Sequence, residues 1–139
     1  MRISEPISRE AILGWLDNWA TCIRSGQFAE AALMFDKDVL GFGTVAIEAK
    51  GLDRLVEQQW MKVWPKTEGF RFDNASVETW APDGLAVAAV HWSSQGIDAR
   101  SGALFSRHGR ATLVLQRRGG NLIAVHTHFS INPAGERFL

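Results

Sequence analysis

Residues 109–130 read GRATLVLQRRGGNLIAVHTHFS, and this stretch decides the fold. Two runs rich in apolar and β-branched residues flank Gly119 and Gly120, a pattern typical of a β-hairpin with a tight turn. Side chains alternate between the two faces of a strand, so the order of residues assigns each one to a side of the sheet. The same alternation shows which side His126 and His128 occupy.

Two registers of this hairpin are possible. A strict two-residue turn places the histidines beside Leu113, whereas a bulge or an odd-numbered loop places them on the face of Arg110 and Thr112. We prefer the bulged register because it separates apolar from polar side chains. One face then carries Ala111, Leu113, Leu115, Ile123, Val125, Thr127 and Phe129, and we expect it to meet the helices. The other carries Arg110, Thr112, Val114, Gln116, Leu122, Ala124, His126 and His128.

The second face has too many apolar residues for a surface bathed wholly in water. This favours a homodimer that forms through the sheet, with Arg110, Thr112, His126 and His128 at the contact. The alternative is a metal site, since histidines two residues apart on a strand can share one ion. No Asp, Glu or Cys nearby shares that face as a third ligand, so we expect neither a metal nor another cofactor.

The rest of the chain divides into helical and strand-like segments. Ser8 is a plausible N-cap of a helix that ends at Gly26, and further helices are predicted over residues 28–35 and 52–64. Strands are predicted over residues 39–44, 70–80 and 85–95, with a loop over 96–106. Helices followed by an antiparallel meander predict an α+β domain, with about three N-terminal helices on one face of a curved sheet.

Composition limits the classes of function. The chain has 139 residues, which predicts a single domain over 1–139, and its 15 basic and 15 acidic residues give zero net charge. We therefore expect no binding to nucleic acid or to an anionic membrane surface. The sequence has no apolar run long enough to span a bilayer. The single cysteine, Cys22, fits a reducing cytoplasm.

Aromatic residues are unusually distributed, with six Trp, eight Phe and no Tyr. So many large rings exceed what a small core usually needs, which favours a cavity or an oligomer interface. A polar candidate for such a cavity is His91, which shares a strand face with Val87, Ala89 and Ser93. These small residues would leave space beneath the helices for a histidine that titrates or donates. The alternative is a core histidine bonded to the backbone or to Ser93.

Several segments resemble the SnoaL-like branch of the nuclear transport factor 2-like superfamily, which includes the ketosteroid isomerases. They are Ala32-Leu33-Met34-Phe35, Phe42-Gly43-Thr44, Gln59-Trp60 through Val63-Trp64, Arg110-x-Thr112 and Val125-His126-x-His128-Phe129-Ser130. The hairpin is also similar to the association domain of calcium/calmodulin-dependent kinase II. The resemblance implies a cone of three helices against a curved antiparallel sheet, a deep pocket between them and dimerisation through the sheet.

The catalytic groups of these relatives do not carry over. The general-base aspartate of the ketosteroid isomerases falls near Phe42, and their tyrosine has no equivalent. Basic residues line the pocket of the kinase association domain, and the resemblance places Leu55, Leu113 and Phe129 at the equivalent positions. The implied pocket is therefore apolar, with His91 as its main polar group.

These observations lead to two hypotheses. The first is a protein with an apolar, tryptophan-lined pocket for a small hydrophobic or aromatic molecule. It could be an isomerase, dehydratase or hydrolase of a hydrophobic carbonyl compound, with His91 as acid or base. The predicted lining is Trp15, Trp19, Phe42, Leu55, Trp60, Trp64, His91, Leu113, Thr127 and Phe129. The alternative is a non-catalytic dimerisation or association module.

Overall fold

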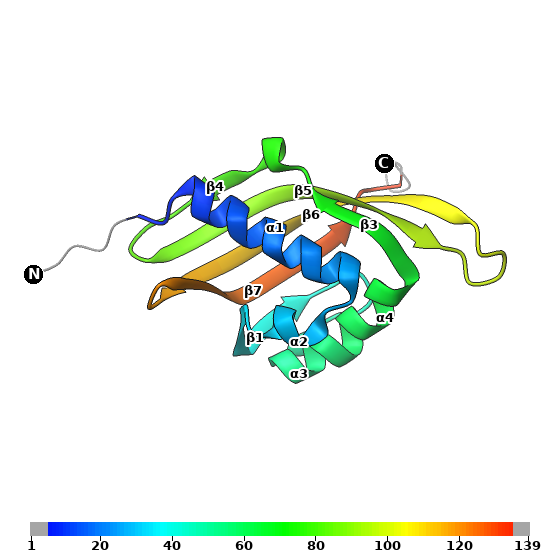
Figure 1. The fold of residues 1–139 in the computed structure, drawn as a ribbon, viewed down its shortest axis with the longest axis horizontal. Helices are drawn as coiled ribbons and strands as arrows, with labels where there is room; N and C mark the ends of the chain where they lie inside the picture. The colour runs from blue at the N-terminus through cyan, green and yellow to red at the C-terminus, as the bar shows by residue number, and fades with distance from the viewer. Residues whose placement is uncertain (1–5, 135–139) are drawn as a thin grey trace, which may run out of the picture.

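The computed structural model describes residues 6–134, which form helices packed on one face of a curved, open sheet (Figure 1). The strands are β1 (Phe35–Phe42), β2 (Ala49–Lys50), β3 (Thr67–Phe72), β4 (Glu78–Trp80), β5 (Leu85–Ile97), β6 (Leu104–Arg118) and β7 (Asn121–Ile131). They lie in the order β2-β1-β7-β6-β5-β3, with β4 beside β5. The β1–β7 pairing is parallel and the others are antiparallel. The predicted α+β class is confirmed.

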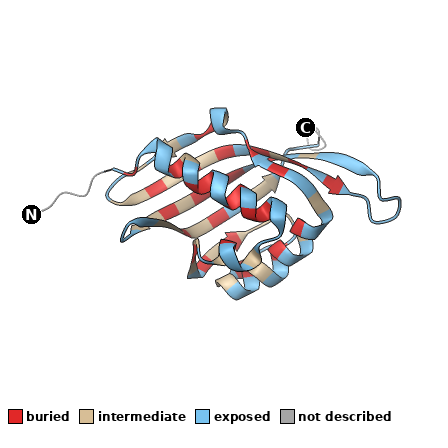
Figure 2. Ribbon diagram, in the orientation of Figure 1, coloured by how far each residue is buried: buried red, intermediate tan, exposed pale blue. Residues whose placement is uncertain are grey.

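Helix α1 (Arg9–Ser25) has the ends that the sequence predicts. The hydroxyl of Ser8 accepts a hydrogen bond from the backbone N–H of Ala11 at 3.1 Å, and Gly26 ends the helix with φ +66°. One stripe of the helix is buried against the sheet (Figure 2). It consists of Ile12, Trp15, Leu16, Trp19, Ala20, Cys22 and Ile23.

Helix α2 (Phe28–Ala32) is shorter than predicted. Phe35 does not extend this helix; it begins β1, where it pairs with Ala124 of β7. Strand β1 therefore starts before Val39 and ends at Phe42, two residues short of the predicted end. Pairing with the central strand overrides the helical spacing of the apolar residues here.

The predicted third helix forms one helical segment with an irregular centre. It consists of α3 (Leu52–Leu55), a π-helical turn η1 (Val56–Trp60), α4 (Met61–Val63) and a 3₁₀ turn η2 (Trp64–Lys66). The segment lies very close to β1, because a Cβ added to Gly41 would be 2.5 Å from Leu55 Cδ1. A Cβ added to Gly43 would be 2.2 Å from Gln59 Oε1. Glycine in β1 at position 41 and directly after it at position 43 permits this approach.

The meander departs from prediction at its connections. The predicted strand 70–80 is split into β3 and β4 by a 3₁₀ turn, η3 (Asn74–Ser76), where the Asp73 carboxylate accepts a hydrogen bond from Ala75 N–H at 3.2 Å. The predicted loop 96–106 shrinks to residues 98–103, because β5 and β6 pair from Ile97 and Leu104 onward. The β5–β6 ribbon consequently extends beyond the helices (Figure 1).

The final hairpin has both a tight turn and a bulge. Arg118 pairs with Asn121 across Gly119 and Gly120, and the register then shifts between Leu115 and Val114. Val125 is the extra residue of this bulge, since Ala124 pairs with Leu115 and His126 pairs with Val114. The bulged register is thus confirmed for His126 and His128. Between the bulge and the turn, the predicted faces of Ile123 and Ala124 were wrong. Ala124 is fully buried there, and Ile123 is only half-buried.

The core is a network of aromatic rings centred on Trp19, which is 2 % exposed. Its ring contacts span both layers of the fold, at centroid distances of 5.0 to 6.2 Å. The partners are Trp15, Phe35, Trp60, Phe72 and Phe129.

We expect Gly109→Ala to destabilise the protein by about 1–3 kcal/mol, because the new Cβ has no space. It would lie 2.1 Å from the carbonyl oxygen of Ser130 and 2.4 Å from the Trp92 ring. Gly14→Ala is the matched control, since nothing lies within 4 Å of its Cβ on exposed α1. Gly14→Ala should raise the unfolding free energy by about 0.5–1 kcal/mol. Urea unfolding measures both, and equal effects would contradict the described packing at Gly109.

Candidate functional site

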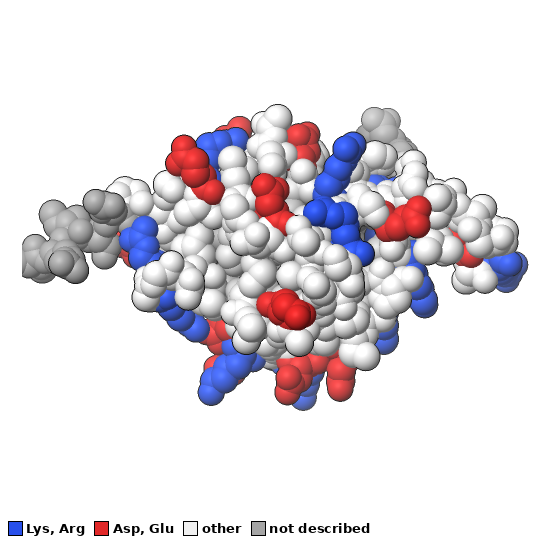
Figure 3. Space-filling model, in the orientation of Figure 1, with Lys and Arg blue, Asp and Glu red and all other residues white. Residues whose placement is uncertain are grey.

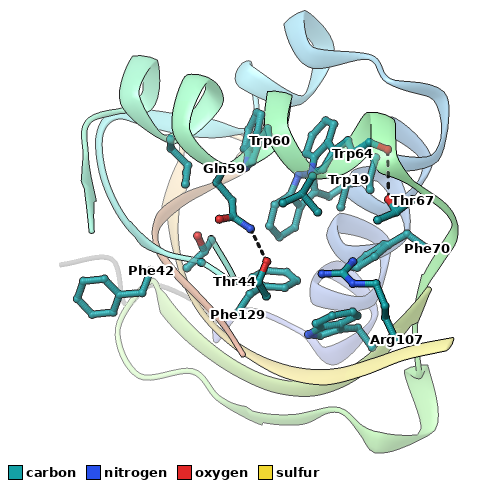
Figure 4. Close-up of a pocket in the computed structure, with 16 residues that line it drawn as sticks. Trp19, Phe42, Thr44, Gln59, Trp60, Trp64, Thr67, Phe70, Arg107 and Phe129 are labelled. Atoms are coloured by element: carbon teal, nitrogen blue, oxygen red, sulfur yellow. Dashed lines mark hydrogen bonds between the residues drawn. The ribbon is translucent and has the colours of Figure 1, made fainter. Parts of the chain in front are cut away.

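A small cavity lies between the helical segment 52–66, α1 and the inner face of the sheet (Figure 4). The space open to water inside it is about 40 Å³, far below the roughly 300–1,000 Å³ of typical small-molecule pockets. Aromatic side chains fill most of the cone that the fold encloses. The lining consists of Trp19, Ile23, Phe42, Gly43, Thr44, Leu55, Gln59, Trp60, Val63, Trp64, Thr67, Phe70, Trp92, Arg107, Thr127 and Phe129.

Indole rings form the helical side of the cavity. Trp60 and Trp64 stack with their centroids 4.7 Å apart, and Phe28 stacks on Trp64 at 5.1 Å. On the sheet side, Phe129 meets the edge of Trp19 at 5.4 Å. The buried indole N–H groups of Trp19 and Trp92 have no hydrogen-bond acceptor within the described part of the chain.

Gln59 links the helical segment to the loop that follows β1. It lies in the π-helical turn, where Met61 N–H donates to the carbonyl of Val56 five residues earlier. Its Oε1 accepts hydrogen bonds from the backbone N–H groups of Val45 and Ala46 at 3.0 and 2.9 Å. Its Nε2 donates to the hydroxyl of Thr44 at 2.9 Å. A side chain that is 9 % exposed thus holds the 43–48 loop beside the cavity.

Arg107 approaches the cavity from the side opposite Gln59 (Figure 4). Its guanidinium lies over the Trp92 ring, 5.3 Å from the centroid, and Nη1 donates to the hydroxyl of Ser94 at 3.3 Å. Burial lowers the pKa of Arg107 from its usual range, because removal from water disfavours the charged form. Arg107 is the one charged side chain in the described lining.

Six of the predicted pocket residues line the cavity: Trp19, Leu55, Trp60, Trp64, Thr127 and Phe129. Phe42 also borders the cavity, but its ring points away from it (Figure 4). That ring lies between His126 and His128, at 5.2 and 5.3 Å from their rings.

Trp15 and Leu113 are buried but do not line the cavity. Trp15 packs against Trp19 and Phe35 at 5.3 and 5.7 Å, so it supports the cavity wall from behind. Leu113 is fully buried in the centre of the sheet. Both are core residues, and their predicted position in the lining was wrong.

His91 is also outside the cavity. Its strand buries Ala86, Ala88, Val90, Trp92 and Ser94, so His91 and its partners Val87, Ala89 and Ser93 point to the opposite face. His91 is exposed there and pairs with Arg110 of β6. His91 was expected in the cavity beneath the helices, but the small residues of β5 lie on both faces, and His91 instead lines an open pocket on the outer face with Asp73 and His108. The large apolar side chain of Trp92 identifies the inner face of the sheet.

Arg107, Trp92 and Gln59 line the cavity but were not predicted from the sequence as site residues. Arg107 follows the same period of two as Ala111 and Leu113, extended backward through Gly109. The predicted loop 96–106 interrupted that pattern and left Arg107 at a strand end. Gln59 lies in the predicted helix over residues 52–64, but no signal in the sequence indicates its bonds to the 43–48 loop.

The four residues predicted for a contact between subunits lie together on the outer face. Thr112 pairs with His128, and Arg110 pairs with Ser130, whose hydroxyl accepts a hydrogen bond from Arg110 Nε at 2.9 Å. His126 is half-buried, with Nδ1 2.7 Å from the carbonyl oxygen of Leu40.

No cluster of three or more His, Cys, Asp or Glu side chains is placed to hold a metal ion in residues 6–134. None of the described helices has the length and apolar character needed to cross a bilayer. On the face seen in Figure 3, acidic and basic side chains of the described residues are interspersed.

Solved structures with this fold cover most of the chain. A nuclear transport factor 2-like superfamily protein from Salmonella enterica shares 17 % identity with a TM-score of 0.78, covering 92 % of this chain and 95 % of its own. A calcium/calmodulin-dependent kinase II hub homology domain from Chlamydomonas reinhardtii shares 22 % identity with a TM-score of 0.72, covering 91 % and 100 %. A nuclear transport factor 2-like protein of unknown function from Pseudomonas putida shares 22 % identity with a TM-score of 0.70, covering 88 % and 84 %.

No curated protein matches the sequence significantly. The family comparison is decisive, because the model of the SnoaL-like domain matches residues 12–134. These include most of α1, the other helices, the curved sheet and every residue of the cavity lining. The chain therefore belongs to the SnoaL-like domain family, and it shares its fold with the nuclear transport factor 2-like structures.

Proposed function

We propose that this protein is a small-molecule-binding domain whose ligand occupies the cavity beside Trp19, Trp60 and Trp64. The observation that carries the proposal is the aromatic lining, which offers ring faces to an apolar or aromatic compound. The hydroxyl of Thr127, a buried residue of the lining, adds a polar group on the sheet side.

The lining favours binding over proton transfer. Its described residues contain no His, Asp, Glu or Cys, which are the usual general acids and bases. Arginine stays protonated in proteins and is a poor base. His91, the acid or base of the isomerase, dehydratase or hydrolase hypothesis, lies on the outer face and does not line this cavity.

The size of the cavity limits the ligand. A space of about 40 Å³ accepts a compound only if it is small or if the border moves. The 43–48 loop is the border best suited to move, because Val45 and Ile47 are 55 % and 94 % exposed. Gln59 provides its main attachment to the helical segment.

Benzyl alcohol is a suitable neutral probe of this cavity. We expect it to shift the NMR signals of the Trp19 and Trp60 indole N–H groups, with saturation at millimolar concentration. Thr127→Leu should weaken its binding at least about 10-fold, because the longer side chain occupies the cavity. The control is Thr112→Leu, the same change on the outer face of the neighbouring strand. Equal affinities of the two variants would contradict the proposed site.

Gln59→Ala removes three hydrogen bonds to the 43–48 loop. We expect faster amide hydrogen exchange at Val45 and Ala46 and a faster off-rate of benzyl alcohol, because the border opens more often. Gln116→Ala is the control, since Gln116 bonds only to Arg118 among the described residues. Unchanged exchange at Val45 in Gln59→Ala would argue against this role of Gln59.

A homodimeric association module is the second candidate function. The outer face supports it, because half-buried Val114 and His126 lie among Arg110, Thr112 and His128. The similarity to a kinase hub homology domain supports it further. On this proposal the sheet forms the contact between two copies.

We expect light scattering to give the mass of a dimer for the wild-type chain. Thr112→Glu should halve that mass, because it places two carboxylates in a contact that excludes water. Ala29→Glu adds the same charge on exposed α2 and should leave the dimer intact. A dimer that persists in Thr112→Glu would exclude this face as the contact.

A further inference from the structure

Arg107 has a charge that no carboxylate of residues 6–134 neutralises. In residues 6–134, no carboxylate oxygen lies within 4.0 Å of its nitrogens, and neither the Lys50–Glu48 nor the Arg118–Asp36 ion pair includes it. Its contacts are the Trp92 ring and the Ser94 hydroxyl. A partly buried cation without an anion is costly, and burial accordingly lowers the pKa of Arg107.

The guanidinium also keeps unused hydrogen-bond donors. It has five N–H groups in a planar fork, and one hydrogen bond to another side chain uses Nη1. Figure 4 shows the group extending from β6 into the cavity toward Phe129. Several N–H donors therefore face a space whose other walls are mostly apolar.

Resting on the proposed function, we infer that Arg107 binds the carboxylate of the ligand, and that the ligand is a small aromatic monocarboxylic acid. The planar fork of arginine matches a carboxylate with two parallel hydrogen bonds. The ring of such an acid would lie among Trp19, Trp60 and Phe129, and its charge would neutralise the guanidinium.

The lining favours a carboxylate over a phosphate. A phosphate carries up to two negative charges, and Arg107 is the one cation that the described lining supplies. The second charge would be desolvated without a partner, which is costly in an apolar site. A monoanion leaves no such excess.

A purely structural role for Arg107 is the competing explanation. Its aliphatic stem and its guanidinium cover the Trp92 ring, and this packing alone could account for its position. The variant Arg107→Met tests the difference, because methionine keeps an apolar stem but removes the charge and the donors. The readout is the ratio of affinities for an acid and its neutral analogue, which packing alone does not change.

The experiment measures the affinities of benzoate and benzyl alcohol by NMR titration at pH 7. We expect the wild type to bind benzoate at least 10-fold more tightly than benzyl alcohol. Arg107→Met should lose about 10- to 100-fold in affinity for benzoate and keep its affinity for benzyl alcohol. Arg71→Met is the matched control. Arg71 also donates to a serine hydroxyl of β5, Ser93 at 3.4 Å, but on the outer face.

The outcomes separate this inference from the proposed function. If benzyl alcohol binds in the cavity but benzoate has no advantage, or keeps it in Arg107→Met, the carboxylate role is overturned and the binding function stands. If inorganic phosphate displaces benzoate as readily as acetate does, the selectivity for a carboxylate is overturned. If neither aromatic probe binds the wild type, both proposals fail.

Discussion

The contacts of Trp19 hold the two layers of this protein together. Its ring, from the middle of α1, touches the start of β1, the π-helical turn, β3 and β7. These segments are far apart in the sequence, so their relative positions depend on one side chain. Each aromatic pair contributes roughly 0.5–1.5 kcal/mol beyond the burial of its area. The cone is consequently filled from its centre outward, and the cavity is the space that remains beside this cluster.

Much of the fold could be predicted from the sequence, because its long segments have one dominant periodicity. The cap at Ser8, the stop at Gly26 and the alternation from Ala111 to Leu115 all agree with the structure. The errors lie where a local pattern competes with pairing between distant strands. Phe35 fits a helical spacing, yet its pairing with Ala124 places it in β1. Sequence alone does not show that such a partner is available.

The candidate site was harder to predict. Side chains alternate between the two faces of a strand, so the face that a residue occupies depends on where the strand begins. On β5, small residues on both faces obscured the direction of His91, which the burial of Trp92 settles. On β6, an expected loop hid that Arg107 shares the inner face with Ala111 and Leu113. The bonds of Gln59 depend on a π-helical turn whose presence the sequence does not indicate. The aromatic walls, by contrast, were largely identified from their number and spacing.

The β5–β6 ribbon extends beyond the helices. Its two ends therefore differ in local stability. Leu113 and Leu115 are fully buried on the inner face of the ribbon, whereas Leu104 and Phe105 are each 50 % exposed. Segments with few buried contacts open without global unfolding, so the distal ribbon can fray while the proximal part stays closed. Arg107 lies at the transition between these two regimes. The aromatic residues of the cavity therefore belong to the part of the protein that opens most slowly. Arg107, the charged residue of its lining, borders the part that opens faster.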